Sequence, residues 1–356
     1  MKCVTRIGRY GARAKDTAMP FRARYALVSA LALMTLTTAP ATAPATAAPP
    51  PAPLDYTALG DSYSAGAFVR PWAADDGCGR STLSYPQQTA RRLNVRLTDV
   101  TCSAAEVRAG VLEPQTEFSG PPSVPPQGGW APRPAQIKAV TAATDLVTLG
   151  IGGNSVGFTD IVTRCIEQGI ASFGTGHPCS THYTRGSGTS SLDGRFAALE
   201  ADFATTLKDI RTRAPHAKVA VVGYPAVVAD SAGCSFGSWR QLGTVTKGDM
   251  PFLDALERRV NAVLRTQAQR AGAVYVDTYA SSTGHGVCAA SDQRWMYGIK
   301  DDLTGSGTQT DPPSDLCRRV PATGEACTVL HPNLRGATHQ ADLVTQALTG
   351  WGATRR

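Results

Sequence analysis

Three short segments carry the residue types that acyl transfer by a serine nucleophile requires. Ser62 follows an apolar run and is preceded by Gly60 and Asp61, so a tight turn would project its hydroxyl above a strand end. Asn154 ends a Gly-Gly-Asn sequence after another apolar run, and its carboxamide could donate to an oxyanion. His331, in a His-Pro-Asn sequence near the C-terminus, could take the serine proton. Each segment by itself also fits an ordinary turn.

The elements around these segments alternate between two kinds. Short apolar runs, typical of buried strands, lie at residues 56–59, 97–100, 146–151, 218–223 and 273–277. Amphipathic stretches, typical of helices, lie at residues 86–93, 135–143, 196–213, 251–270 and 337–348. This alternation predicts an α/β fold, a three-layer α/β/α sandwich with a central parallel sheet. Ligands of such sheets bind at the carboxyl ends of the strands, which is where Ser62 and Asn154 are expected.

Three segments interrupt the alternation and are predicted to be surface loops over the strand ends. They are rich in Gly, Pro, Ser or Thr and cover residues 113–133, 173–192 and 292–327. Four aromatic residues in exposed loops could line an apolar acyl groove, or could simply pack there: Trp72, Phe118, Trp130 and Phe173.

The N-terminus has the pattern of a secretory signal peptide. Basic residues up to position 24 precede an apolar run at 25–36, which ends in small residues and prolines. That run is shorter than the roughly 20 apolar residues of a membrane-spanning helix. We expect a signal peptide at 1–48, a flexible lead-in at 49–54 and a single domain at 55–352, secreted as a monomer without stable membrane insertion. Either Met1 or Met19 can be the true start.

Charge excludes one class of partner. The net charge of +7 is concentrated in residues 1–48, which hold seven basic residues and one acidic residue, so about +1 remains for the rest. No basic run with interleaved aromatic residues occurs, and we expect no nucleic-acid partner.

Eight cysteines follow the signal peptide, an even number that in an exported chain predicts disulfides. Many pairings are open in principle, and pairing of sequence neighbours is the simplest. The expected bonds are then Cys78–Cys102, Cys165–Cys179, Cys234–Cys288 and Cys317–Cys327. A metal site at His177, Cys179 and His182 is the weaker interpretation, because an exported cysteine usually oxidises. We expect no metal.

Taken together and in order, these segments resemble the conserved blocks of the SGNH (GDSL-type) hydrolases, in particular the secreted actinobacterial esterase and lipase branch. The sequence GDSYSAG at 60–66 is similar to the nucleophile block, IGGN at 151–154 to the Gly-x-Asn block and HPN at 331–333 to the histidine block. The turn at 223–225 and the segment 284–288 also look like that branch. The resemblance extends from residue 56 through the last helix and implies the flavodoxin-like SGNH hydrolase fold.

The resemblance also implies a role for each residue. Ser62 would be the nucleophile, and His331 would act as general base and then as general acid. The oxyanion hole would consist of the N–H groups of Ser62 and Ala104 and the side chain of Asn154. The chemistry would pass through an acyl-enzyme and need no cofactor.

Two positions depart from the family pattern. Ala104 stands where the family usually has Gly, which keeps the N–H donor but adds a methyl group near the acyl group. Thr328 stands where the family usually has the Asp that orients the histidine. Some secreted members use a main-chain carbonyl instead, so we expect the carbonyl of Thr328 to orient His331. Four loop acids remain alternatives: Asp301, Asp302, Asp311 and Asp315.

Rival interpretations of the chemistry remain open. The G-x-S-x-G pattern of α/β-hydrolases occurs at 153–157 and 233–237, and Ser155, Asp277 and His331 follow the chain order of that family. His285 is a second candidate base, although a structural role beside a disulfide is favoured. A secreted protein that binds glycan or lipid without catalysis is the alternative from another class.

The expected function is that of a secreted lipase or esterase acting on carboxylic esters. The substrate is expected to be a small-molecule or lipid ester, and the resemblance favours the lipid type. A carbohydrate deacetylase or a phospholipase on the same scaffold is the alternative.

Overall fold

The computed structural model describes residues 52–118, 126–185, 189–228, 234, 239–299, 317–320, 324–327 and 330–349. The predicted signal peptide lies outside these ranges. Within them, every helix is too short or too polar to cross a membrane.

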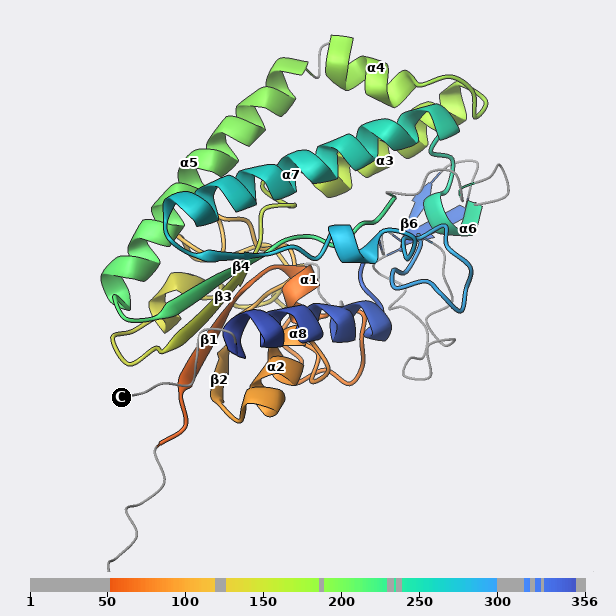
Figure 1. Cartoon of the computed structure of the whole chain (residues 1–356). Coiled ribbons are helices and arrows are strands. Elements are labelled where there is room, and N and C mark those ends of the chain that lie inside the picture. The colour runs from red at the N-terminus through yellow and green to blue at the C-terminus, as the bar shows by residue number, and fades with distance from the viewer. Residues whose placement is uncertain are drawn as a thin grey trace, which may run out of the picture. The chain divides into compact units, whose positions relative to one another are not determined.

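Five parallel strands form the central sheet in the order β2-β1-β3-β4-β5 (Figure 1). They are β1 Asp55–Gly60, β2 Arg96–Asp99, β3 Leu146–Gly150, β4 Lys218–Val222 and β5 Val274–Val276. All five predicted strands are therefore present, with only small shifts at their ends. The order is that of the flavodoxin-like doubly wound fold. It places β1, which carries the Ser62 segment, next to β3, which carries the Asn154 segment.

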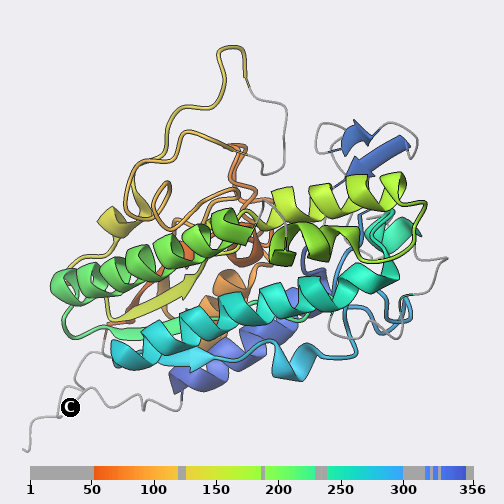
Figure 2. The same ribbon diagram turned by 90° about the horizontal axis from the view of Figure 1, so that it is seen from above.

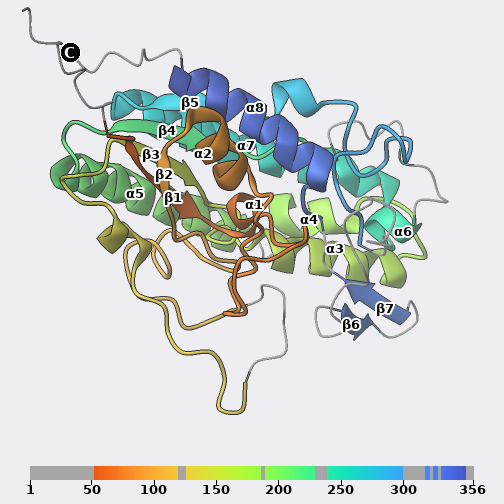
Figure 3. The same cartoon turned by 90° about the horizontal axis from the view of Figure 1, so that it is seen from below.

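Helices cover both faces of this sheet, which confirms the predicted three-layer α/β/α sandwich. One face carries α2 Tyr85–Leu93 and α8 Leu334–Thr349, which lie side by side (Figures 1 and 3). The opposite face carries α5 Thr189–Arg213 and α7 Met250–Arg270, with α3 Phe158–Ala171 beyond them (Figures 1 and 2).

Side chains of the inner strands β1, β3 and β4 alternate between two hydrophobic cores, as the period of two in a β-strand requires. The core under α2 and α8 takes Tyr56, Ala58, Leu146, Ala220 and Val222 from the strands. The larger core under α3, α5 and α7 takes Leu59, Val147, Leu149, Val219 and Val221. Because both faces of these inner strands are buried, they read as largely apolar runs in the sequence.

The remaining elements are short and lie mostly in the connections. They are α1 Ser62–Ala65, α4 Pro178–Arg185, α6 Trp239–Leu242, η1 Gln136–Ala139, η2 Lys247–Asp249, η3 Ala280–Ser282, β6 Cys317–Val320 and β7 Gly324–Cys327. Three expectations were wrong here. The helix predicted over 135–143 is only the 3-10 turn η1, and the loop predicted over 173–192 holds α4 and the start of α5. The loop predicted over 292–327 ends in the strands β6 and β7.

Three disulfides fasten connections to the body of the fold. They are Cys78–Cys102, Cys165–Cys179 and Cys234–Cys288, which are three of the four expected pairs. The strands β6 and β7 pair in antiparallel fashion with Cys317 opposite Cys327. The side chains of this last pair lie outside the described residues.

Close packing of α3 against the segment before α7 gives a test of the fold. A Cβ atom built on Gly169 would lie 1.8 Å from the carbonyl oxygen of Thr244, whereas one built on Gly194, in α5, would meet no atom within 4 Å. We expect Gly169→Ala to lower the free energy of unfolding by about 2–3 kcal/mol through overpacking. Gly194→Ala should raise it by about 0.5–1 kcal/mol, since Ala favours helix. Urea unfolding measures both, and a gain in stability from Gly169→Ala would contradict the described packing.

Candidate active site

The turn after β1 places the Ser62 hydroxyl at the carboxyl edge of the sheet. Ser62 is the first residue of α1, and the side chain of Asp61 caps this helix by accepting from the N–H of Tyr63 at 3.0 Å. The turn is tight: a Cβ atom on Gly60 would lie 2.3 Å from Ser64 Oγ and 2.6 Å from the carbonyl oxygen of Gly150. Glycine is therefore required before the Asp-Ser pair.

His331 lies next to Ser62 in space, although the two residues are far apart in the sequence. Its Nε2 lies 2.7 Å from Ser62 Oγ, a hydrogen-bond distance. The ring packs against Tyr63 and Phe68, with ring centroids 4.8 and 4.7 Å away. The structure thus brings together the two residues that the sequence analysis named as nucleophile and base.

The backbone around His331 is held by hydrogen bonds to residues 294–297. The N–H of Tyr297 donates to the carbonyl of His331 at 2.8 Å, and the N–H of Asn333 donates to the carbonyl of Trp295 at 2.8 Å. The side chain of Asn333 donates to the carbonyl of Arg294 at 2.9 Å. Three hydrogen bonds thus hold the histidine loop before α8 in one place.

The other ring nitrogen of His331, Nδ1, differs from Nε2 in its hydrogen bonding. Among the described residues, no group forms a hydrogen bond with its Nδ1, which is buried. Burial lowers the pKa of His331 to about 3, because the charged imidazolium loses its hydration. The ring is therefore neutral near pH 7 and able to accept a proton. Thr328 and the four alternative acids, Asp301, Asp302, Asp311 and Asp315, lie outside the described residues.

The two expected oxyanion donors besides Ser62 lie in neighbouring loops. Ala104 has φ +66°, in the left-handed region that favours glycine. The position thus explains why the family usually has Gly there, and Ala adopts the same conformation. Asn154 Nδ2 donates to the carbonyl of Ala105 at 3.0 Å, which orients the carboxamide and leaves its second N–H unused by that bond.

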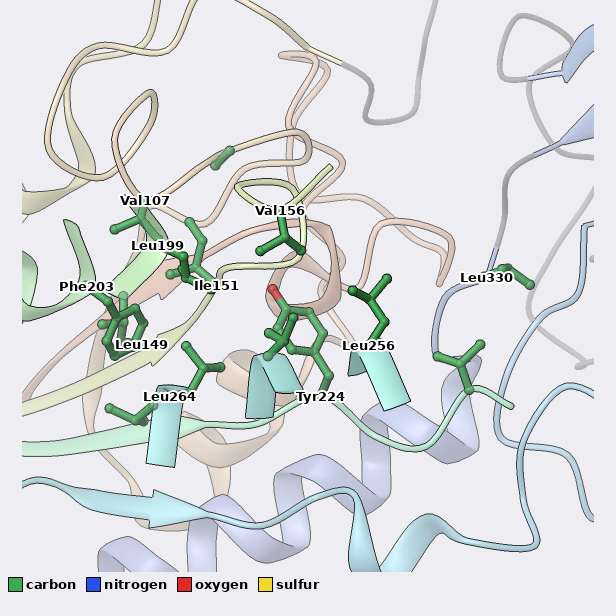
Figure 4. Close-up of a cluster of buried hydrophobic side chains, with 14 of the residues drawn as sticks. Val107, Leu149, Ile151, Val156, Leu199, Phe203, Tyr224, Leu256, Leu264 and Leu330 are labelled. Carbon is green, nitrogen blue, oxygen red and sulfur yellow. The ribbon is translucent and has the colours of Figure 1, made fainter. Parts of the chain in front are cut away.

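Tyr224 links the nucleophile turn to the Asn154 loop, a role that the sequence analysis missed. Its hydroxyl donates to the carboxylate of Asp61 and accepts from the N–H of Gly153 at 2.8 Å. Figure 4 shows the hydroxyl directed toward the loop that carries Val156. The signal in the sequence was a Tyr two residues after the end of β4, at the same sheet edge.

The backbone of Tyr224 is itself held by α7. Asn261 Oδ1 accepts from the N–H of Tyr224 at 2.8 Å, and Asn261 Nδ2 donates to its carbonyl at 3.0 Å. Asp61, at the other end of this network, is buried, and burial raises its pKa to about 6. The network therefore ties three strand ends and one helix together.

A cavity of about 490 Å³ opens at these residues. Its walls combine the site residues Ser62, Ala104, Asn154, Tyr224 and His331 with two further groups. One group is apolar and consists of Phe68, Phe118, Phe158, Val162, Val227, Val260 and Leu330. The other is charged and consists of Asp160, Arg164, Glu167 and Glu257.

Of the four loop aromatics proposed for an acyl groove, only Phe118 lines this cavity. Trp72 donates to the carbonyl of Ala67 and packs under Arg70. Phe173 stands on the surface with 90% of its area exposed.

The rival residues are engaged elsewhere. Ser155 Oγ accepts from the N–H of Val107 at 3.0 Å, and Asp277 pairs with Arg265. His285 bonds the carbonyl of Gln293 through Nδ1 at 2.7 Å and stacks on Trp295. The second G-x-S-x-G sequence, around residue 235, lies outside the described residues. Across the described side chains, no three His, Cys, Asp or Glu residues gather in a way that could hold a metal ion, and Cys179 is in a disulfide.

Comparison with known proteins bears on the family and the fold of the chain. A sequence model of the GDSL-like lipase/acylhydrolase family matches residues 58–339. "Lipase 2" of Streptomyces coelicolor is 40% identical over 249 residues, which are 68% of this chain and 76% of that protein. A "Lipase" of Streptomyces rimosus is 28% identical over 69% of this chain and 76% of its own length.

Solved structures share the fold. Phospholipase A1 from Streptomyces albidoflavus NA297 superposes with a TM-score of 0.59 at 23% identity, covering 83% of this chain and 99% of that one. The extracellular lipase from Streptomyces rimosus superposes with a TM-score of 0.57 at 24% identity, with the same coverage. The chain belongs to the GDSL-like lipase/acylhydrolase family and is a carboxylic ester hydrolase.

Proposed function

We propose that this ester hydrolase is a secreted serine lipase or esterase that acts through an acyl-enzyme on Ser62. The observation that supports the proposal most directly is the 2.7 Å contact between Ser62 Oγ and His331 Nε2 in a cavity shared with Ala104 and Asn154. Nucleophile, base and oxyanion donors of this kind are the parts that acyl transfer needs.

The proposed reaction follows from these positions. His331 Nε2 takes the proton of Ser62 as Oγ attacks the ester carbonyl. The resulting oxyanion accepts hydrogen bonds from the N–H groups of Ser62 and Ala104 and from Asn154 Nδ2. His331 then returns the proton to the leaving alcohol, and water attacks the acyl-enzyme with His331 again as base.

The carbonyl of Thr328 is proposed to accept from Nδ1–H of His331. One observation supports this assignment. Nδ1 has no hydrogen-bond partner in the described part of the chain, and a buried ring N–H of this kind requires an acceptor.

Secretion and a lipid-type substrate belong to the same proposal. The leader at residues 1–48 and the three disulfides fit an exported monomer with one domain at 55–352. The apolar walls of the cavity fit an acyl chain, and the names of the relatives point the same way.

Substitution of the serine tests the nucleophile. We expect Ser62→Ala to lower kcat on p-nitrophenyl esters by about 10⁴-fold or more, because no other group attacks the carbonyl. Ser155→Ala is the matched control and should keep most of the activity, since Ser155 only accepts a backbone hydrogen bond. Full activity in Ser62→Ala would refute the assignment. An ester series from acetate to palmitate, together with phosphatidylcholine, separates lipase, short-chain esterase and phospholipase.

The pH profile tests the neutral histidine. Because the pKa of His331 is lowered, the base stays unprotonated as the pH falls, and kcat/KM should hold its plateau well below pH 6 before the acid limb begins. Asp61, with a pKa of about 6, is the other group near the serine that titrates in this range. An acid limb between pH 6 and 7 that persists in Asp61→Asn would contradict the lowered pKa of His331.

Tyr224 is proposed as a positioning residue for the serine and the Asn154 loop. Tyr224→Phe leaves the buried N–H of Gly153 and the carboxylate of Asp61 short of a partner, at about 1–3 kcal/mol of stability. We expect kcat to fall about tenfold or more while KM changes by less than about threefold, because alignment rather than substrate contact is lost.

Tyr279→Phe is the matched control for this test. It removes another Tyr hydroxyl that donates to a carboxylate, that of Asp254, outside the lining of the cavity. Its kcat should match that of the wild type. Equal losses of kcat in the two variants would show that Tyr224 acts through stability alone.

A further inference from the structure

Trp295 lies outside the lining of the cavity, yet its main chain binds the histidine loop, residues 331–333. Its carbonyl accepts from the N–H of Asn333 at 2.8 Å. The next residue, Met296, pairs with Pro332 in an isolated antiparallel bridge. The two stretches of backbone therefore run side by side, and a displacement of the Trp295 segment would carry the histidine with it.

The segment that contains Trp295 has little regular structure of its own. Residues 290–299 form turns and irregular backbone, apart from the bridge at Met296. The indole ring connects this segment to two other parts of the chain. It stacks on His285, after η3, with ring centroids 3.7 Å apart and planes within 6°. It also contacts His339 of α8, with centroids 4.4 Å apart and planes at 35°. Aromatic contacts of this kind add to stability beyond the area that they bury.

Each of the two imidazole rings is oriented by a hydrogen bond that does not involve the indole. His285 Nδ1 lies 2.7 Å from the carbonyl oxygen of Gln293, and His339 Nε2 lies 2.8 Å from Ser281 Oγ. The N–H of Trp295 also donates to the carbonyl of His285 at 2.9 Å. The rings therefore offer the indole a defined place to pack.

The contact between Trp295 and His339 joins the two sides of the histidine loop, because α8 begins directly after that loop. The packing there is close. A Cβ atom on Gly336, in the first turn of α8, would lie 2.5 Å from the carbonyl oxygen of Trp295 and 3.0 Å from Pro332 Cβ. The start of α8, the histidine loop and the Trp295 segment are thus packed against one another.

We propose that the indole of Trp295, through its contacts with His285 and His339, is a positioning group that keeps His331 aligned with Ser62. The inference rests on the proposed acyl-enzyme function, in which the 2.7 Å contact between Ser62 Oγ and His331 Nε2 transfers the serine proton. Alignment of this kind is sensitive, because a displacement of about 1 Å can lower a rate about 100-fold.

Replacement of the ring tests the proposal and leaves the main-chain hydrogen bonds available. We expect Trp295→Leu to lower kcat on p-nitrophenyl octanoate by about tenfold or more. KM should change by less than about threefold, because alignment rather than substrate contact is lost. Trp295→Phe keeps an aromatic ring and should recover most of kcat. Phenylmethylsulfonyl fluoride, which reacts with the activated serine, should inactivate Trp295→Leu more slowly, in proportion to the loss of kcat.

The pH profile gives a readout that a loss of stability alone would not move. In the wild type, burial holds the pKa of His331 at about 3. A looser histidine loop would admit water to the ring and let its pKa rise toward the ordinary value of about 6.5. The acid limb of kcat/KM should therefore lie at higher pH in Trp295→Leu than in the wild type, and Trp295→Phe should move it back.

Two further variants make the test specific. Trp130→Leu is the matched control: this partly buried indole packs against Gly77, where a Cβ atom would lie 2.9 Å from the ring, and it does not line the cavity. Its kcat and acid limb should equal those of the wild type. His339→Leu removes one of the two ring contacts of Trp295 and should give a smaller loss of kcat in the same direction. Urea unfolding establishes that each variant is folded under the conditions of the assay.

The outcomes distinguish the two proposals. Wild-type kcat and an unmoved acid limb in folded Trp295→Leu or His339→Leu overturn the role of Trp295 and leave Ser62 intact, as do equal losses in Trp130→Leu. Folded wild-type protein that hydrolyses no ester overturns the acyl-enzyme function itself.

Discussion

The close approach of α1 to the ends of β1 and β3 is the constraint on which the site depends. Gly60 and Gly150 are partners in the parallel pairing, and the hydroxyl of Ser64 sits against both, donating to the carbonyl of Gly150 at 2.9 Å. A Cβ atom on either glycine would come within 2.6 Å of Ser64 Oγ or closer. Only with both side chains absent can the helix start directly above the sheet, where the serine meets the histidine.

Much of this arrangement follows from the sequence because a parallel sheet gathers its strand ends at one edge. Ser62, Asn154 and Tyr224 each come within a few residues of the end of a buried strand, so their neighbourhood in space is a consequence of topology. Long helices such as α7 could equally be predicted from the sequence, since their apolar positions recur at helical spacing. The parts that depend only on local pattern and strand order could thus be predicted.

The parts that depend on distant partners could not be predicted. Helix α4 has a polar, Thr- and Ser-containing sequence, and it is supported by tertiary contacts: Asp249 accepts from the N–H groups of Cys179 and Ser180, and Cys179 is bonded to Cys165. Such capping by a residue far along the chain leaves no local signal. The same holds for Glu257, which reads in the sequence as one more charge on an amphipathic helix but is 4% exposed and accepts from the N–H of Val227, after β4.

Within the described ranges no acid forms a hydrogen bond with His331, and its lowered pKa has a consequence for which half of the proposed reaction is fast. A buried imidazole with a low pKa is a weak base, but the imidazolium that it becomes is a correspondingly strong acid. Proton removal from the serine is then the harder step, and expulsion of a poor leaving group is the easier one. Alkyl esters, whose alkoxide must be protonated to depart, benefit from this bias, whereas aryl esters with acidic phenols do not. Under the proposed mechanism, such a histidine would favour the unactivated esters of ordinary alcohols.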